Sequence, residues 1–211
     1  MDKEIVLSAN ELYYLGKLLQ ARYIDYSYIA AMEDVSKNYS VFESESEKSL
    51  SEKGYIEEDF AGEKEVNPVL KSLLEPLFFG EREAAVSICT VGEEPVLSCF
   101  NFHFADENIT MVDMSDDTLK ITATDNETVR KFVSGILPED YIGECTKDIK
   151  VEKEMVTWLI IVKSAVVGKG SVIKKYIEAD GTVFGESGTG LESMTRDMFV
   201  DEVYGVIKEG N

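Results

Sequence analysis

Residues 84–104 read AAVSICTVGEEPVLSCFNFHF, and this stretch decides the fold class. Apolar residues recur at alternate positions in 84–91 and again in 96–104, which is the period of a strand with one buried face. The residues between them, 92–95, are typical of a turn. The stretch therefore predicts an antiparallel hairpin. Three aromatic side chains of its second strand would share one face: Phe100, Phe102 and Phe104.

The hairpin begins a longer unit of strands that ends in a helix. Residues 108–113 and 118–124 predict two further strands. A helix follows through Leu137, with Asp125 or Asn126 as its N-cap. Because several strands precede the helix and do not alternate with helices, the pattern is typical of an antiparallel sheet in an α+β protein.

The last third of the chain repeats this layout. Strands are predicted at residues 155–166, 171–178 and 182–186. A closing helix is predicted to begin at Ser193, its N-cap, and to run to Lys208. The order is again strands first and one helix last, so the second unit resembles the first.

The two similar halves predict a quasi-two-fold duplicated fold. The first strands-plus-helix unit spans residues 81–140 and the second spans 141–211, and a helical N-terminal part, residues 1–80, packs on the same globular domain. Each unit alone would leave one sheet face open and would be marginally stable. Pairing the units around an approximate two-fold axis would bury both faces in a common interior.

The N-terminal part carries clear helix signals. Ser8 and Glu11 have the spacing of a capping box, and Asn67 before Pro68 is an N-cap followed by proline at the first helical position. Gly54 stands where a left-handed residue would end a helix. Four helices are expected, at residues 8–22, 25–38, 43–53 and 67–80, the last of them ended by Pro76 and Gly80.

The charge and the apolar runs limit the environment and the partners. The chain has 41 acidic and 21 basic residues, a net charge of −20, which works against binding to nucleic acid or anionic lipid and favours basic or neutral partners. The apolar run 155–162 is too short for membrane insertion, and the first residues, MDKE, show no signal peptide. We therefore expect a cytoplasmic protein.

The three cysteines fit that expectation. Their number is odd and no C-x-x-C spacing occurs, which is typical of reduced thiols that serve as small buried apolar side chains. A pair such as Cys89 and Cys99, facing each other across a hairpin, stays open at this point. The third cysteine is Cys145.

Residues that could carry catalysis or bind a metal are scarce. His103 is the one histidine, and nothing near it in sequence would orient it as a base, so we predict no enzyme activity and no cofactor. The glycine-rich segment 185–190 lacks the lysine of a phosphate loop and is interpreted as a flexible connection. Zinc is not expected. A calcium or magnesium ion at Asp116 and Asp117 stays open, although no EF-hand loop is present.

Three segments give the chain a resemblance to a known family. Residues 7–15 (LSANELYYL), 50–56 (LSEKGYI) and 66–70 (VNPVL) are similar to the beginning of the EspG family, the secretion-associated proteins of type VII (ESX) systems. The resemblance extends loosely over residues 5–207 and includes the duplicated strands-then-helix halves. It implies an EspG-like fold and a cytosolic chaperone that binds PE–PPE substrate pairs.

The chain also departs from that family. It is shorter, and it is rich in Lys and Glu with few Ala and Arg, which favours a distant relative from a low-G+C Gram-positive organism. In such an organism a WXG100 or LXG helical hairpin would replace the PE–PPE pair as the substrate. None of the family's residues for substrate binding can be transferred to a position of this chain.

The sequence thus predicts a cytosolic chaperone or adaptor for a helical substrate of a type VII secretion system. The alternative is an acidic immunity or inhibitor protein that neutralises a toxin, with its acidic surface against a basic active site. The oligomeric state stays open. The partner-binding residues are expected at a projecting hairpin turn: Val166, Val167, Gly168, Lys169 and Gly170.

Overall fold

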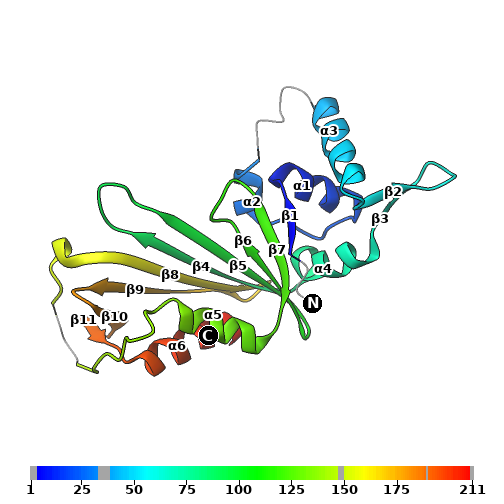
Figure 1. Ribbon diagram of the computed structural model, residues 1–211. Helices are drawn as coiled ribbons and strands as arrows, with labels where there is room; N and C mark the ends of the chain where they lie inside the picture. Colours follow the sequence, from blue (N-terminus) through cyan, green and yellow to red (C-terminus); the bar gives the residue numbers. More distant parts are fainter. Residues whose placement is uncertain (1–3, 33–38, 147–149, 189, 210–211) are drawn as a thin grey trace. The chain divides into compact units, whose positions relative to one another are not determined.

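A computed structural model of the chain describes residues 4–32, 39–146, 150–188 and 190–209 (Figure 1). The chain forms two compact units. Unit 1 combines residues 1–80 with 103–123, and unit 2 combines residues 81–102 with 124–211. The domain boundaries expected from the sequence, at residues 80 and 140, and the single globular domain stay predictions.

Unit 1 holds the helical N-terminal part and a portion of the strands. Its helices and strands are β1 (Ile5–Leu7), α1 (Ala9–Leu18), α2 (Tyr26–Ala30), α3 (Tyr39–Glu52), β2 (Ile56–Glu58), β3 (Lys64–Val66), α4 (Pro68–Phe79), β6 (Asn108–Asp113) and most of β7 (Leu119–Thr124). Strand β5 (Leu97–Ala105) contributes its last residues to this unit. The helices enclose an apolar core with β1, β6 and β7.

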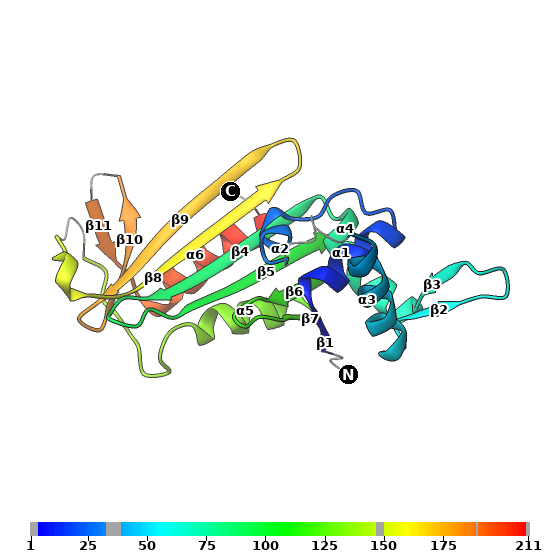
Figure 2. The ribbon, with the colours of Figure 1, turned by 90° about the horizontal axis from the view of Figure 1, so that it is seen from above.

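Unit 2 holds the longest strands and two helices. They are β4 (Arg82–Thr90), the first part of β5, α5 (Asn126–Gly135), the 3-10 turn η1 (Lys153–Met155), β8 (Val156–Val166), β9 (Gly170–Ala179), β10 (Thr182–Ser187), β11 (Gly190–Ser193) and α6 (Arg196–Glu209). Figure 2 shows α5 and α6 side by side, and Arg130 of α5 forms an ion pair with Asp201 of α6. Both helices therefore belong to one layer.

Neighbouring strands confirm the α+β fold with antiparallel pairing. Their order is β1-β7-β6-β5-β4-β8-β9-β10-β11, and a separate hairpin is formed by β2 and β3. Strands β4 to β7 are followed by α5, and strands β8 to β11 by α6, so the chain contains the expected strands-then-helix repeat. In each repeat, strands that are consecutive in sequence are neighbours.

The two repeats meet in a way that differs from the expectation. The antiparallel pair β4–β8, from Arg82↔Val166 to Thr90↔Trp158, joins the repeats through their first strands. The expectation that the two units pair and bury both sheet faces in a common interior is therefore wrong. Joining the first strands satisfies the backbone groups of two strands that would otherwise be open edges.

The local helix signals in the first eighty residues are mostly confirmed. The Ser8 hydroxyl accepts a hydrogen bond from the Glu11 amide, and the Glu11 carboxylate accepts one from the Ser8 amide. Gly54 has a φ of 69°, and Asn67 caps α4. Pro76, however, does not end α4: the helix continues to Phe79, because the burial of Leu77 and Phe78 offsets the cost of the hydrogen bond that proline cannot donate.

Three other expectations fail, and three short strands were not expected. In the glycine-rich segment 185–190, residues 185–187 belong to β10 and Gly190 begins β11, so these residues form paired strands and no flexible connection, while Thr189 lies outside the described residues. Ser193 ends β11 and does not cap α6; its hydroxyl donates to the Glu144 carbonyl at 2.6 Å. Helix α2 is shorter than predicted, and residues 33–38 lie outside the described residues. Strands β1, β2 and β3 are three residues long, too short for a periodic signal.

The interior of unit 2 is built on aromatic rings that face α5 and α6. Phe132 of α5 packs edge-on against Phe100 and Phe102, with ring centroids 4.8 and 5.4 Å apart. Phe199 of α6 packs against Tyr176 of β9 at 5.3 Å. This confirms that Phe100 and Phe102 share a face, and it explains why their strand alternates.

His103 lies in the interior of unit 1 and not on its surface. Its Nε2 is 2.7 Å from the hydroxyl oxygen of Tyr28, and the residue is almost fully buried. Burial lowers the pKa of His103 to about 4, although the Asp25 charge opposes the shift. The imidazole is therefore neutral in the folded protein at physiological pH.

We expect this histidine to make the fold sensitive to acid. The unfolded chain binds a proton at His103 near pH 6.5, whereas the folded chain does so only near pH 4, so stability falls as the pH falls between these values, by roughly 3 kcal/mol in total. Replacing His103 with Gln keeps a neutral partner for Tyr28 and removes that loss. The check is the free energy of unfolding in urea across this pH range; equal slopes for the two proteins would contradict the prediction.

Candidate functional site

Exposed apolar side chains gather at the turn between β4 and β5. Val91, Val96, Leu97 and Met155 have exposed fractions between 43% and 61%. We call these four residues the turn patch. Singly exposed apolar residues are normal on a protein surface, but a group of them rimmed by polar residues is typical of a protein-binding site.

Hydrogen bonds hold the members of the turn patch together. The Thr90 amide donates to the Val96 carbonyl at 3.0 Å, and the Val96 amide donates to the Thr90 hydroxyl at 2.7 Å. The Val91 amide donates to the Thr157 carbonyl at 2.7 Å, which places Val91 beside the start of β8. Met155 precedes that residue by two positions. Leu97 lies on β5, Met155 lies in the 3-10 turn before β8, and the hydrogen bonds of Val91 and Val96 fix the backbone just beyond the strand ends.

The rim of the turn patch is charged and mostly acidic. Glu93 and Glu94 are exposed at the tip between β4 and β5, and Glu152, Lys153 and Glu154 are exposed before β8. An apolar centre within a polar rim is the usual anatomy of a protein interface. The excess of carboxylates favours a partner whose apolar residues are flanked by neutral or basic ones.

The turn predicted as partner-binding lies at the other end of β8. Val166 is the last residue of β8, Gly170 is the first of β9, and the Lys169 amide donates to the Val166 carbonyl at 3.0 Å. Gly168 and Gly170 have positive φ values of 78° and 99°, so glycine is required for this turn. Val167 is exposed as a single apolar residue. A binding role for residues 166–170 stays a prediction.

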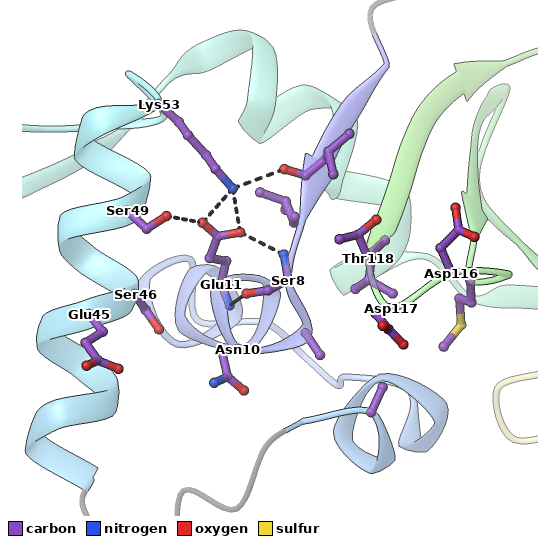
Figure 3. A pocket seen from close by; sticks show the side chains of 16 residues that line it. Ser8, Asn10, Glu11, Glu45, Ser46, Ser49, Lys53, Asp116, Asp117 and Thr118 are labelled. Atoms are coloured by element: carbon purple, nitrogen blue, oxygen red, sulfur yellow. Dashed lines mark hydrogen bonds and ion pairs between the residues drawn. The ribbon is translucent and has the colours of Figure 1, made fainter.

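Unit 1 contains a polar pocket with a volume of about 770 Å³ (Figure 3). The start of α1, the side of α3 and the turn before β7 supply its walls. Glu11 lies at its base: Oε1 accepts from the Ser49 hydroxyl and from Lys53 Nζ, both at 2.7 Å, and Oε2 accepts from the Ser8 amide at 2.7 Å. The Lys53 amine also reaches the Val6 carbonyl at 3.3 Å.

This network makes Glu11 a structural carboxylate. Burial raises the pKa of Glu11, but the hydrogen bonds from Lys53, Ser8 and Ser49 more than offset burial, so the pKa lies below its ordinary value. Every oxygen of the carboxylate has a donor. The group therefore ties α1 to α3 and is not available as a general base.

Replacing Glu11 with Gln is expected to destabilise unit 1 by about 1–2 kcal/mol, because Lys53 loses its charged partner while the amide oxygen of Gln can still accept from the Ser8 amide. Because the folded-state pKa of Glu11 is lowered, its contribution is present above its ordinary pKa of 4.5 and is lost as the pH falls through the lowered value. Urea unfolding at neutral and acid pH measures both effects.

The matched control for that substitution is Glu52→Gln, which removes an exposed i,i+4 pair with Lys48. It should change stability by less than about 0.5 kcal/mol. If both substitutions have the same effect, the capping network contributes nothing beyond a surface ion pair, and the interpretation of Glu11 is wrong.

Asp116 and Asp117, which were left open as ligands of a calcium or magnesium ion, both line the polar pocket of unit 1. Asp116 pairs with Lys120 at 2.5 Å, and within the described ranges no group of three His, Cys, Asp or Glu residues could hold a metal ion. Cys89 and Cys99 form no disulfide, so the pair across the hairpin stays reduced in the structure. Cys145 is exposed, which corrects the expectation of a buried side chain.

In the described ranges of the chain no helix is long and apolar enough to cross a membrane.

The turn patch was not predicted as a site from the sequence. Residues 92–95 were assigned to a turn, but Val96 and Leu97 were assigned to a strand with one buried face, so their exposure was not visible. The signal that could have found them is the apolar pair that follows two glutamates and a proline at a hairpin tip. Such a pair lies where a strand extends beyond the helices that cover it.

Comparison with solved structures finds a likeness over the full length of the chain. The Mycobacterium tuberculosis type VII secretion system chaperone EspG5, solved in complex with a PE25–PPE41 dimer, matches with a TM-score of 0.64 at 9% sequence identity, and the match covers 99% of this chain and 98% of that chain. No family model matches the chain, and no curated protein matches it. The likeness shows the fold, and it confirms that the chain has an EspG-like fold.

Proposed function

We propose that this protein is a cytoplasmic chaperone or adaptor that binds a helical substrate of a type VII secretion system and is not an enzyme. The observation that carries the proposal is the turn patch, an exposed apolar group on a fold like that of a secretion chaperone. The chaperone with the similar fold was solved with a PE25–PPE41 dimer bound. This supports a helical secretion substrate as the class of partner that the turn patch binds.

The turn patch would act by covering an apolar helix end of the substrate. Full burial of a Val, Leu or Met side chain contributes roughly 1.5–3 kcal/mol, and about half of each side chain is exposed, so the four together supply roughly 3–6 kcal/mol. The entropy of association consumes much of that amount. The patch suffices to shield a substrate from self-association, while tight binding needs a further contact surface.

The substrate would be of the WXG100, LXG or PE–PPE type. Each presents helices, and the acidic rim of the turn patch selects an apolar helix end with neutral or basic neighbours. The composition of the chain, rich in Lys and Glu, keeps the proposal of a low-G+C Gram-positive source and of a WXG100 or LXG substrate.

The alternative is an acidic immunity or inhibitor protein. Its supporting observation is the net charge of −20, which would complement a basic active site. The two proposals differ in the partner: a helical secretion substrate supports the first, and a toxin enzyme that loses activity supports the second. The likeness to a chaperone favours the first.

Co-expression tests the proposed function. A WXG100, LXG or PE–PPE substrate from the same genome, produced with this protein, should stay soluble and co-purify in a fixed ratio, whereas the substrate alone should aggregate. A substrate that is equally soluble with and without this protein, and that does not co-purify, would overturn the proposal.

A further inference from the structure

Strand β8 has an apolar pattern that its helix does not explain. Residues 156–166 read VTWLIIVKSAV, with apolar side chains on both faces over much of the strand. A strand that is covered on one face normally alternates apolar with polar residues, whereas a nearly continuous apolar run is typical of a strand covered on both faces. The sequence of β8 therefore predicts that other residues pack on both of its faces.

One face of β8 has its cover. Ile160 and Val162 are fully buried, and Ile160 pairs with Tyr176, whose ring packs against Phe199 of α6. On this face Lys174 of β9 is paired with Glu202 of α6, with 3.2 Å between Nζ and Oε1. Helix α6 thus satisfies both the apolar and the charged side chains that point toward it.

The other face of β8 and β9 has six neighbouring side chains that share an orientation. The cross-strand pairs are Leu159↔Ile177, Ile161↔Lys175 and Lys163↔Ile173. We call these six residues the lysine face. Ile173 is 53% exposed, both lysines are exposed, and the other three side chains are half-buried. The face is therefore apolar in composition but accessible.

The two lysines of this face have no carboxylate partner. Within the described part of the chain, neither Lys163 nor Lys175 takes part in an ion pair, in contrast to Lys174 on the opposite face. They stand diagonally across the β8–β9 pair, a separation of about 7–8 Å. Two unpaired cations at this spacing, in a chain of net charge −20, favour a carboxylate that comes from a partner.

We propose that the lysine face binds an amphipathic helix of the secretion substrate, which lays apolar residues on Ile161, Ile173 and Ile177 and sets one acidic residue between Lys163 and Lys175. The proposal rests on the proposed function and names the second contact surface that the turn patch requires. A helix is the occupant that suits this surface, because it contacts side chains that point away from the sheet, whereas an added strand would pair with a backbone edge, and the free edge of β9 lies beyond its pairing with β10 at residues 176–179.

A second copy of this chain is a poor occupant. A two-fold contact through the same surface would set the lysines of one copy near those of the other, and like charges at a contact are repulsive. A strongly acidic partner is also unfavourable, because the whole chain is negative. The fitting helix is mostly apolar on its contact side and carries few acidic residues.

A charge-reversal experiment tests the proposal. The probe is a labelled 18-residue designed helical peptide with Leu at positions i, i+4, i+7 and i+11 and one Glu beside them, and a matched peptide has Lys in place of that Glu. Fluorescence anisotropy should show that Lys163→Glu with Lys175→Glu weakens binding of the Glu peptide roughly 10-fold or more, and that the same double variant binds the Lys peptide more tightly than the unchanged protein does.

The matched control is Lys48→Glu with Lys71→Glu, which makes the same change in net charge on two exposed helix positions of unit 1. It should leave binding of both peptides within about 2-fold of the unchanged protein. Equal effects of the two double variants, equal binding of the two peptides, or a dimer of this chain through the lysine face would overturn the proposal.

The outcome is separable from that of the proposed function. If the substrate co-purifies with the protein but charge reversal changes no binding, the lysine face is not a contact surface and the chaperone function stands. If the Glu peptide binds as expected and every secretion substrate fails to co-purify, the lysine face is a helix-binding surface for another protein and the assignment to a secretion substrate is overturned.

Discussion

Replacing Val96 and Leu97 of the turn patch with Asp lowers the affinity for the helical substrate by roughly 100-fold. Both side chains are more than half exposed, Leu97 begins β5, and Val96 lies just before it, hydrogen-bonded to Thr90, so charges placed there leave the fold intact. In the complex, however, each carboxylate would be buried against an apolar helix end without a partner. A loss of about 2.7 kcal/mol corresponds to 100-fold, which two uncompensated charges at the centre of an interface readily produce.

Calorimetric titration of the purified substrate measures this loss. The matched control is Val41→Asp with Val69→Asp, two equally exposed apolar residues on α3 and α4 of unit 1. The control pair should bind the substrate as the unchanged protein does. If the control pair weakens binding as strongly, the effect comes from added negative charge and not from the turn patch.

Replacing Phe199 with Ala lowers the free energy of unfolding by about 3–5 kcal/mol. The side chain is fully buried on α6, and its ring packs on Tyr176, 5.3 Å away and nearly perpendicular to it. Truncation removes the transfer free energy of a large aromatic group and leaves a cavity between α6 and β9, which relaxes only in part. Unfolding in urea, followed by circular dichroism, gives the value.

Phe60→Ala is the control for this substitution. Phe60 is fully exposed beside the β2–β3 hairpin, so its truncation should change stability by less than about 0.5 kcal/mol. A small effect at Phe199 would mean that α6 does not close the interior of unit 2, and the face of β8 opposite the lysine face would then also lack its cover.

The periodicity of apolar residues and the helix-capping motifs predicted most of the strands and helices of this chain. The alternation in residues 84–104 gave β4 and β5 within two residues of their observed ends, because each strand has one face against helices. The capping box at Ser8 and the N-cap at Asn67 were readable because they depend on neighbours within three residues. Such signals do not need the tertiary structure.

What could not be predicted depends on contacts between distant residues. Strand β1 has three residues, and it is defined by its pairing with β7 more than a hundred residues later. Ser193 looked like an N-cap because its partners, near Glu144, are remote in sequence. The antiparallel pairing of β4 with β8 likewise cannot be predicted from any local sequence pattern.

The turn patch and the lysine face differ in how far the sequence could have predicted them. The lysine face left a signal, since β8 fails to alternate, but residues 155–166 were predicted only as an apolar strand. The turn patch was hidden by the assumption that an apolar strand residue is a buried one. Exposure at the end of a strand depends on where the covering helices stop, and α5 and α6 are encoded far from residues 91–97.

Amide hydrogen exchange of the protein alone and with its co-purified substrate tests the central claim most directly. If the proposed function is correct, bound substrate slows exchange at residues 91–97 and 155–157, the turn patch and its hydrogen-bonded neighbours, and leaves the pocket beside Glu11 unchanged. Slowed exchange confined to other residues, such as the turn 166–170, or no change anywhere in a proven complex, would contradict it.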